Sequence, residues 1–93
     1  ELAQAFNVPA TMHDCTGPMT LLSGLHCAAA SANVVLQETV RAHIRTIYER
    51  LIDQQPVVEN GWLIPPTVPG LGTAFLPELF DSQYRNVRRS EKQ

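Results

Sequence analysis

Two side chains that can move protons, His13 and Glu38, each come shortly after an apolar run of the chain. His13 directly follows the run Val8–Met12, and Glu38 follows Val34–Leu36 after one further residue. An imidazole gives and takes a proton around neutral pH, and a carboxyl group can share the same reacting centre. If both runs are neighbouring parallel strands, their ends meet on the face where catalytic side chains of parallel barrels gather. The spacing therefore predicts acid–base chemistry at that face.

A plainer interpretation stands beside each candidate. A histidine at a strand end is more often a structural hydrogen-bonding group, and Glu38 would also suit the positive end of a following helix. Asp14 is the alternative to His13 as the catalytic residue of this loop, although a loop aspartate usually caps or closes a turn. His43 is a candidate substrate contact or simply an exposed residue. His26 falls in a helix that looks buried, where a satisfied core or interface histidine is the expected role.

The composition is that of an ordinary folded protein and excludes some classes of partner. Of the 93 residues, 44% are hydrophobic and 17% charged, and the net charge is −2. Such a chain has no positive field for nucleic acid. No His, Cys or carboxylate cluster has metal-ligand spacing. No apolar run has the length of a membrane span, no signal peptide leads the chain, and Cys15 and Cys27 are expected to be free thiols, so we expect a cytoplasmic protein.

The elements that must position these residues follow from the apolar pattern. Val8–Met12 and 34–36 are predicted strands, and the small-residue helix 19–32 between them begins at Pro18 with Thr16 as its cap. A strand, helix and strand within roughly 30 residues predict a parallel βαβ unit with a right-handed crossover. Two strands cannot close a sheet. Together with the uncapped helical start of residues 1–6, this predicts a fragment of a larger protein.

The second half of the chain alternates a periodic helix with turn-rich segments. The apolar positions that recur at helical spacing predict one amphipathic helix: Val40, Ile44, Ile47, Tyr48, Leu51 and Ile52. Asn60-Gly61 predicts a hairpin over residues 57–64, and the prolines and glycines of 65–72 predict an irregular course. Tyr48 and Trp62 are expected in the core.

Several short motifs, in this order and spacing, resemble one known family. They are His13-Asp14-Cys15-Thr16-Gly17-Pro18, Leu36-Gln37-Glu38, Val40-Arg41-Ala42, Glu59-Asn60-Gly61 and Pro69-Gly70-Leu71-Gly72. Together they resemble the C-terminal portion of the mandelate racemase/muconate lactonizing enzyme branch of the enolase superfamily, closest to galactonate dehydratase-like acid-sugar dehydratases. The resemblance covers nearly the whole chain.

The resemblance implies a fold of the α/β class. Residues 1–55 would supply the last strands and helices of a modified (β/α)8, TIM-type barrel. Residues 56–93 would form a C-terminal extension that completes an α+β capping domain.

The resemblance also implies roles for particular residues. His13 would be the histidine of a His–Asp dyad, and Glu38 would hydrogen-bond a substrate carboxylate oxygen as enolate character develops. Asp14 and His43 have no role carried over from the family; their positions next to His13 and near the predicted mouth of the barrel make them the candidate substrate contacts. Mg²⁺ would be held by carboxylates outside this chain.

The implied activity is a hydro-lyase reaction. It begins with α-proton abstraction next to a carboxylate, continues through an enediolate, and ends with loss of the β-hydroxyl to give a 2-keto-3-deoxy sugar acid. The implied partners are a small sugar-acid substrate, the remaining part of the same polypeptide and further copies in a homo-oligomer, with no nucleic acid and no membrane. A racemase or epimerase of the same superfamily and a non-catalytic binding or structural member are the alternatives.

Overall fold

The computed structural model describes residues 1–81, 86, 88 and 90; the rest of the expected C-terminal extension lies outside the described residues. The elements, in chain order, are α1 (Leu2–Ala5), β1 (Ala10–Met12), α2 (Pro18–Ala29), β2 (Val34–Gln37), α3 (Arg41–Thr46), the 3₁₀ turn η1 (Tyr48–Arg50), β3 (Val57–Glu59), β4 (Trp62–Ile64) and the 3₁₀ turn η2 (Pro77–Leu79).

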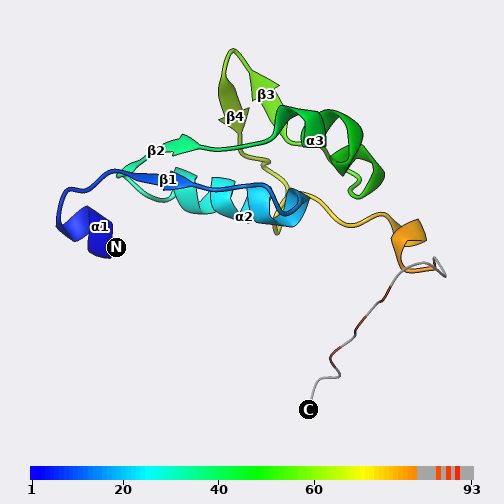
Figure 1. Cartoon of the computed structure of the whole chain (residues 1–93). Coiled ribbons are helices and arrows are strands. Elements are labelled where there is room, and N and C mark those ends of the chain that lie inside the picture. Colours follow the sequence, from blue (N-terminus) through cyan, green and yellow to red (C-terminus); the bar gives the residue numbers. More distant parts are fainter. Residues whose placement is uncertain (82–85, 87, 89, 91–93) are drawn as a thin grey trace.

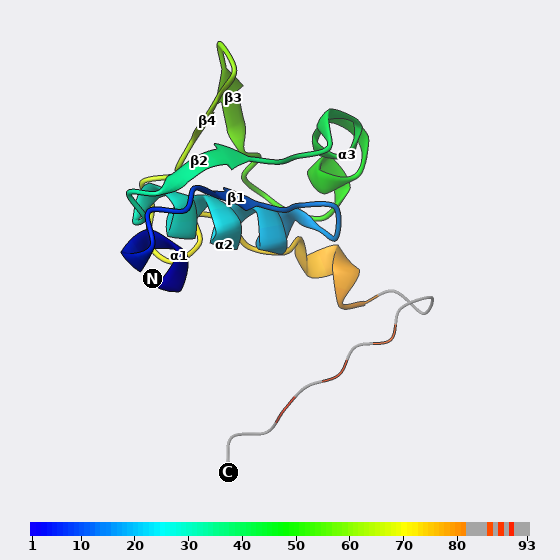
Figure 2. The ribbon, with the colours of Figure 1, turned by 60° about the vertical axis from the view of Figure 1, so that its left-hand side comes forward.

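The predicted βαβ unit is confirmed. β1 and β2 pair in parallel, with Thr11 opposite Leu36 and Met12 opposite Gln37. Helix α2 connects them and lies along one face of the pair (Figures 1 and 2). β1 begins later than expected because the N–H of Val8 already donates to the Ala3 carbonyl at 2.8 Å.

Helix α2 differs from its expected form at both ends. Pro18 occupies the first turn as predicted, but Gly17 is the N-cap and no side chain caps the helix. The expected cap at Thr16 is therefore wrong, because its hydroxyl bonds to Thr20 Oγ1 at 2.9 Å instead. At the other end the helix stops at Ala29, and the Ser31 hydroxyl donates to the Cys27 carbonyl at 2.7 Å.

The periodic helix after β2 is broken, and its predicted apolar stripe is buried only in part, since Ile47 is 45% exposed. α3 ends at Thr46, and a separate 3₁₀ turn begins at Tyr48. The Thr46 hydroxyl donates back to the Ala42 carbonyl at 2.7 Å, a bond that bends helices. Tyr48 and Ile52 are buried as the period predicted. The expectation of one continuous helix is wrong.

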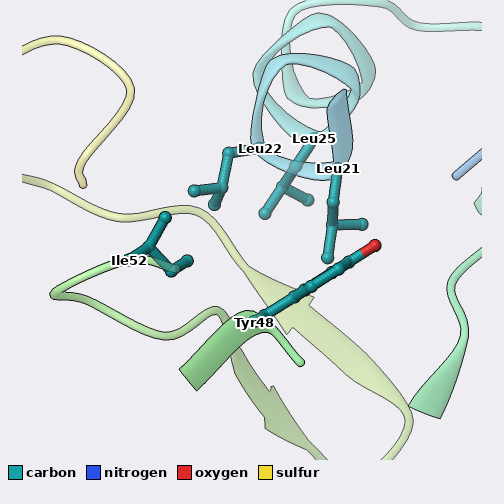
Figure 3. Close-up of a cluster of buried hydrophobic side chains, with 5 residues drawn as sticks. All are labelled: Leu21, Leu22, Leu25, Tyr48 and Ile52. Atoms are coloured by element: carbon teal, nitrogen blue, oxygen red, sulfur yellow. The ribbon is translucent and has the colours of Figure 1, made fainter. Parts of the chain in front are cut away.

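The core lies between α2 and the segment around η1. Within the part of the chain that the structure describes, it consists of five buried side chains: Leu21, Leu22, Leu25, Tyr48 and Ile52 (Figure 3). All three leucines come from one face of α2, at the spacing of helical turns. They form one cluster with Tyr48 and Ile52, so the core ties α2 to the chain that follows β2.

The predicted hairpin is confirmed, with β3 and β4 antiparallel and Glu59 opposite Trp62. Asn60 and Gly61 both have positive φ, at 49° and 83°, as a tight hairpin turn requires. The expectation that Trp62 is a core residue is wrong, because Trp62 is 73% exposed, whereas the next residue, Leu63, is the one that packs against the core. Within the described part, no helix is long and apolar enough to cross a membrane.

Candidate active site

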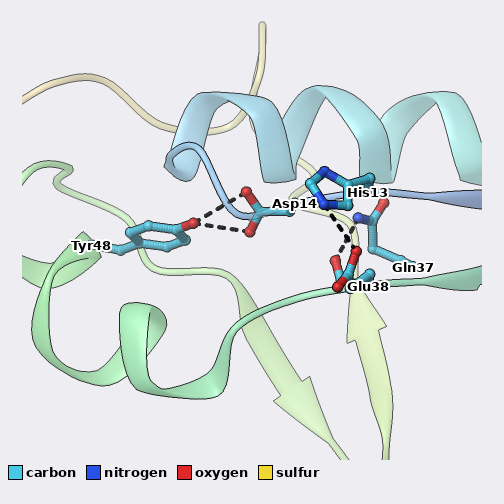
Figure 4. A network of polar contacts seen from close by, with 5 residues as sticks. All are labelled: His13, Asp14, Gln37, Glu38 and Tyr48. Atoms are coloured by element: carbon cyan, nitrogen blue, oxygen red, sulfur yellow. Dashed lines mark hydrogen bonds and ion pairs between the residues drawn. The ribbon is translucent and has the colours of Figure 1, made fainter.

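His13 and Glu38 lie side by side at the carboxyl ends of the two parallel strands. The Glu38 N–H donates to the Met12 carbonyl at 2.8 Å, which extends the β1–β2 ladder to the residue before His13. The His13 Nε2 lies 3.5 Å from Glu38 Oε2 (Figure 4). The sequence expectation that strand ends bring these two side chains together agrees with this geometry.

Both side chains of the pair remain open to solvent. The His13 side chain is 67% exposed and that of Glu38 is 56% exposed. A solvated pair of this kind adds little to folding stability, typically about 0–1 kcal/mol. The arrangement therefore has small value as a structural contact and leaves an imidazole and a carboxyl group free to meet a ligand.

The face of the sheet that carries the pair is the one that α2 leaves uncovered. A Cβ on Gly24 would lie 3.0 Å from Gln37 Oε1 and 3.6 Å from Met12 Cβ, so α2 approaches the sheet closely on the Met12 and Gln37 side. Leu36, on the other face, is 68% exposed. Side chains alternate along a strand, which directs Glu38 to the face of Leu36 rather than to α2.

Gln37 holds the main chain of Glu38. Its side-chain amide donates to the Glu38 carbonyl at 2.8 Å, while its Oε1 is buried without a partner among the described residues. Because Gly24 leaves room for this side chain, the Gln37 amide lies between the sheet and α2.

Asp14 and Tyr48 form a buried pair beside the site. Asp14 is fully buried and Tyr48 is 1% exposed. The Tyr48 hydroxyl donates to the Asp14 carboxylate, at 2.9 Å from Oδ2 and 3.2 Å from Oδ1 (Figure 4). Burial raises the pKa of Tyr48, and the hydrogen bond to Asp14 and the charge of that group raise it further. The hydroxyl therefore stays a donor at neutral pH.

The remaining histidines lie apart from the pair. His43 is half-buried on α3, with its ring centroid 6.0 Å from that of Tyr48. His26 Nε2 lies 3.3 Å from the Leu71 carbonyl, which agrees with a satisfied interface histidine. A hollow of about 430 Å³ opens beside His13 toward α2, but Glu38 is not among its lining residues.

Comparison with known proteins identifies the family. Residues 1–79 match the model of the enolase C-terminal domain-like family. The chain belongs to this family. Among curated protein sequences, none matches the chain significantly.

Solved structures agree with this membership in the enolase superfamily. An enolase protein from environmental sequencing of the Sargasso Sea is 40% identical over 99% of this chain and 24% of its own, with a TM-score of 0.85. A mandelate racemase subgroup enolase from Agrobacterium tumefaciens, solved with a succinimide residue, sodium and phosphate, is 35% identical over 86% of this chain and 22% of its own, with a TM-score of 0.78. This chain thus spans about a quarter or less of the length of these enolases.

The described residues of this family member do not fit a magnesium site. No group of three or more histidines, cysteines or carboxylates that could hold a metal exists in the described part of the chain. His13 and Glu38 offer only two potential donors, and those two contact each other.

The structure gives Asp14 surroundings that the sequence did not suggest. Its position next to His13 made it a candidate substrate contact, whereas the structure encloses the carboxylate against Tyr48. The one available signal was the tyrosine on a buried helical stripe, because a buried phenol needs a hydrogen-bond partner.

Cys15 and Cys27 are free and exposed, which confirms the expected thiols.

Proposed function

We propose that this chain is part of a magnesium-dependent acid-sugar dehydratase and carries its proton-donating histidine. The observation that supports the proposal most directly is the 3.5 Å contact of His13 with Glu38 at the carboxyl ends of adjacent parallel strands. Strand ends of this kind are where barrel enzymes hold their reacting groups. The likeness to mandelate racemase subgroup enolases supports chemistry at a carbon next to a carboxylate.

The proposed reaction removes water from a 2,3-dihydroxy acid. A base outside this chain takes the α-proton, and the C–H electron pair forms an enediolate. That electron pair then expels the β-hydroxyl: the C–O bond breaks, and the oxygen leaves as water with a proton from the His13 imidazolium. The resulting enol takes up a proton at carbon to give the 2-keto-3-deoxy acid.

Glu38 has a separate part in this proposal. In its protonated form it donates a hydrogen bond to a substrate carboxylate oxygen while negative charge builds up there. A fixed donor aimed at developing charge stabilises a transition state more than a ground state. Its contact with His13 keeps the donor and the general acid on one side of the substrate.

The proposal assigns the remaining requirements to other parts of the polypeptide. Because the described residues hold no metal cluster, the magnesium ligands would come from outside this chain. Residues 1–55 would complete the barrel wall, and 56–93 would extend to a capping domain. We also propose that the complete enzyme is cytoplasmic and forms a homo-oligomer.

The test uses the polypeptide that carries this segment, with Mg²⁺, on a set of aldonic and aldaric acids in D₂O. The expected result is a 2-keto-3-deoxy product, detected by NMR, with His13→Asn as the matched inactive control. Deuterium at the α-carbon without loss of water would favour the racemase or epimerase alternative. If the folded protein gave no product and no deuterium exchange with any of the acids, this result would contradict the proposal and favour a non-catalytic member.

A further inference from the structure

We propose that Asp14 and Tyr48 are positioning residues whose buried hydrogen bond sets the placement of His13 relative to Glu38. This inference rests on the proposed function for its kinetic consequences. Its structural content, a link between the two loops that carry the pair, stands on the geometry alone (Figure 4).

The link joins the two chain segments just beyond the end of the sheet. The last ladder bond runs from the Glu38 N–H to the Met12 carbonyl, before His13. Past this point one segment turns into α2 and the other into α3, so the ladder no longer fixes their separation. Asp14 directly follows His13, and Tyr48 opens the turn after α3. The hydrogen bond between them restores a connection where the ladder has ended.

Tyr48 is a rigid anchor for this connection. Its ring is 1% exposed and packs with Leu21 and Leu22 of α2 (Figure 3). A close-packed aromatic side chain holds one rotamer, so the hydroxyl oxygen is delivered to a fixed point. The Asp14 carboxylate can accept this hydrogen bond only when it lies at that point.

Asp14 has a strong reason to stay there. It is fully buried, and within the described residues Tyr48 is the only side chain that donates to its carboxylate. A buried carboxylate that loses its donor is costly, so alternative placements of the loop are disfavoured. The same restraint acts on the adjacent His13, whose own side chain is too exposed to be held by packing.

The arrangement also explains why Asp14 differs from a substrate-contacting carboxylate. The Tyr48 hydroxyl lies within hydrogen-bond distance of both of its oxygens, and none of the side chain reaches solvent. On the other strand, the hydrogen bond from the Gln37 side-chain amide to the Glu38 carbonyl restrains Glu38. His13 and Glu38 are thus each held through the residue next to them.

The first experiment removes only the phenol oxygen, by Tyr48→Phe, in the polypeptide that carries this segment. Misplacement of a reacting group by about 1 Å can cost roughly 10²-fold in rate. We expect kcat to fall by about 10- to 100-fold while KM changes by less than about two-fold. Ile52→Val is the control, because it trims the same core without touching Asp14. It should lower the melting temperature but leave kcat unchanged.

A conservative rescue covers the case in which Tyr48→Phe does not fold. Asp14→Asn keeps an oxygen that accepts from Tyr48, whereas Asp14→Ala keeps none. We expect the asparagine variant to retain most of kcat and the alanine variant to lose it. Equal activity of the two variants would overturn the inference.

A crystal structure of Tyr48→Phe, or of Asp14→Ala if the first variant is not folded, decides the question without any activity. The expected result is a His13–Glu38 separation beyond hydrogen-bond reach, and an unchanged contact would overturn the positioning role. If His13→Asn kept full activity, the proposed function would fail, yet this structural comparison would still decide whether the two buried residues position the pair.

Discussion

The Nε2 atom of His13 lies 3.5 Å from Oε2 of Glu38 as a direct consequence of strand register. Met12 is paired with Gln37, so the residues that follow each of them emerge side by side on the same face. A shift of one residue in the register would turn Glu38 toward α2 and away from the histidine. Residues that fix the register, such as Gln37 against Gly24, therefore contribute to the site without joining its chemistry.

The first prediction concerns His13→Asn in the polypeptide that carries this segment. Asparagine keeps part of the shape and hydrogen bonding of the imidazole but cannot transfer a proton near neutral pH. Loss of a positioned general acid or base typically costs about 10²- to 10⁴-fold in rate. We expect turnover of the true substrate to fall by at least that order. Because His13 is mostly exposed, the melting temperature should remain unchanged.

Glu38→Gln is the matched comparison for this prediction. An amide can still donate a hydrogen bond to the substrate oxygen, so the rate should fall less than in His13→Asn. Steady-state kinetics of both variants with the same acid decide the order. Near wild-type turnover of His13→Asn would make His13 a structural histidine at a strand end.

Local sequence signals were sufficient where one principle dominated. The parallel unit followed from two apolar runs and a small-residue helix, and the hairpin from Asn60-Gly61, whose positive φ angles few other residues adopt. Burial of Tyr48 and Ile52 followed from helical spacing. The break after α3 did not, because the hydrogen bond from the Thr46 hydroxyl to the Ala42 carbonyl bends the helix, and apolar spacing does not reveal such a bond.

The candidate site was predictable only in part, for a related reason. His13 and Glu38 could be placed together because parallel strands align their ends. The Asp14–Tyr48 bond joins a loop to a turn 34 residues later, and no local pattern encodes such a contact. Trp62 shows the opposite failure. A large aromatic residue is usually expected in a core, yet Trp62 is 73% exposed in the described part of the chain.

The second prediction concerns acid sensitivity at Asp53. Hydrogen bonds from the Ala74 N–H and then from the Thr73 hydroxyl, each 2.9 Å from Asp53 Oδ1, hold the pKa of this carboxyl below its ordinary value. A lowered folded-state pKa stabilises the fold above the unfolded-state pKa of about 3.9, and this contribution is lost as pH falls through the folded-state value. Thr73→Val should therefore reduce the drop in stability between neutral and acid pH.

The reduction should be partial, since the larger cause, the Ala74 N–H, remains in the variant. Melting temperatures from neutral to acid pH, of the polypeptide that carries this segment and of its Thr73→Val variant, measure the difference. Thr67→Val, at an exposed threonine outside this cluster, serves as control. An identical pH profile for wild type and Thr73→Val would contradict the assigned cause.

The third prediction separates backbone strain from steric overlap in the glycine-rich segment. Gly70 and Gly72 have φ of 74° and 82°, a conformation that costs an alanine roughly 1–2 kcal/mol. A Cβ at Gly70 meets nothing within 4 Å, whereas one at Gly72 overlaps the ring of Pro66. Gly72→Ala should therefore be more destabilising than Gly70→Ala, by a further ~1–3 kcal/mol for overpacking. Denaturant unfolding of both variants, made in the polypeptide that carries this segment, measures this difference, and equal losses would show that Pro66 does not restrain the position.

The last prediction concerns the 93-residue chain expressed alone. Among its described residues, the core holds only five buried hydrophobic side chains. Val35 and Leu36 on β2 are 61% and 68% exposed, and Trp62 on β4 is 73% exposed. Large uncovered apolar surface of this kind drives association. Moreover, a core of this size is small against the conformational entropy that folding must overcome. We expect the isolated chain to aggregate or to melt without a cooperative transition, as followed by circular dichroism and light scattering.

Replacing the exposed Val35 and Leu36 by threonine should improve its solubility without producing a cooperative melt, because the core remains too small. A sharp two-state transition of the unmodified, monomeric chain would show that its buried contacts alone are enough to specify the fold.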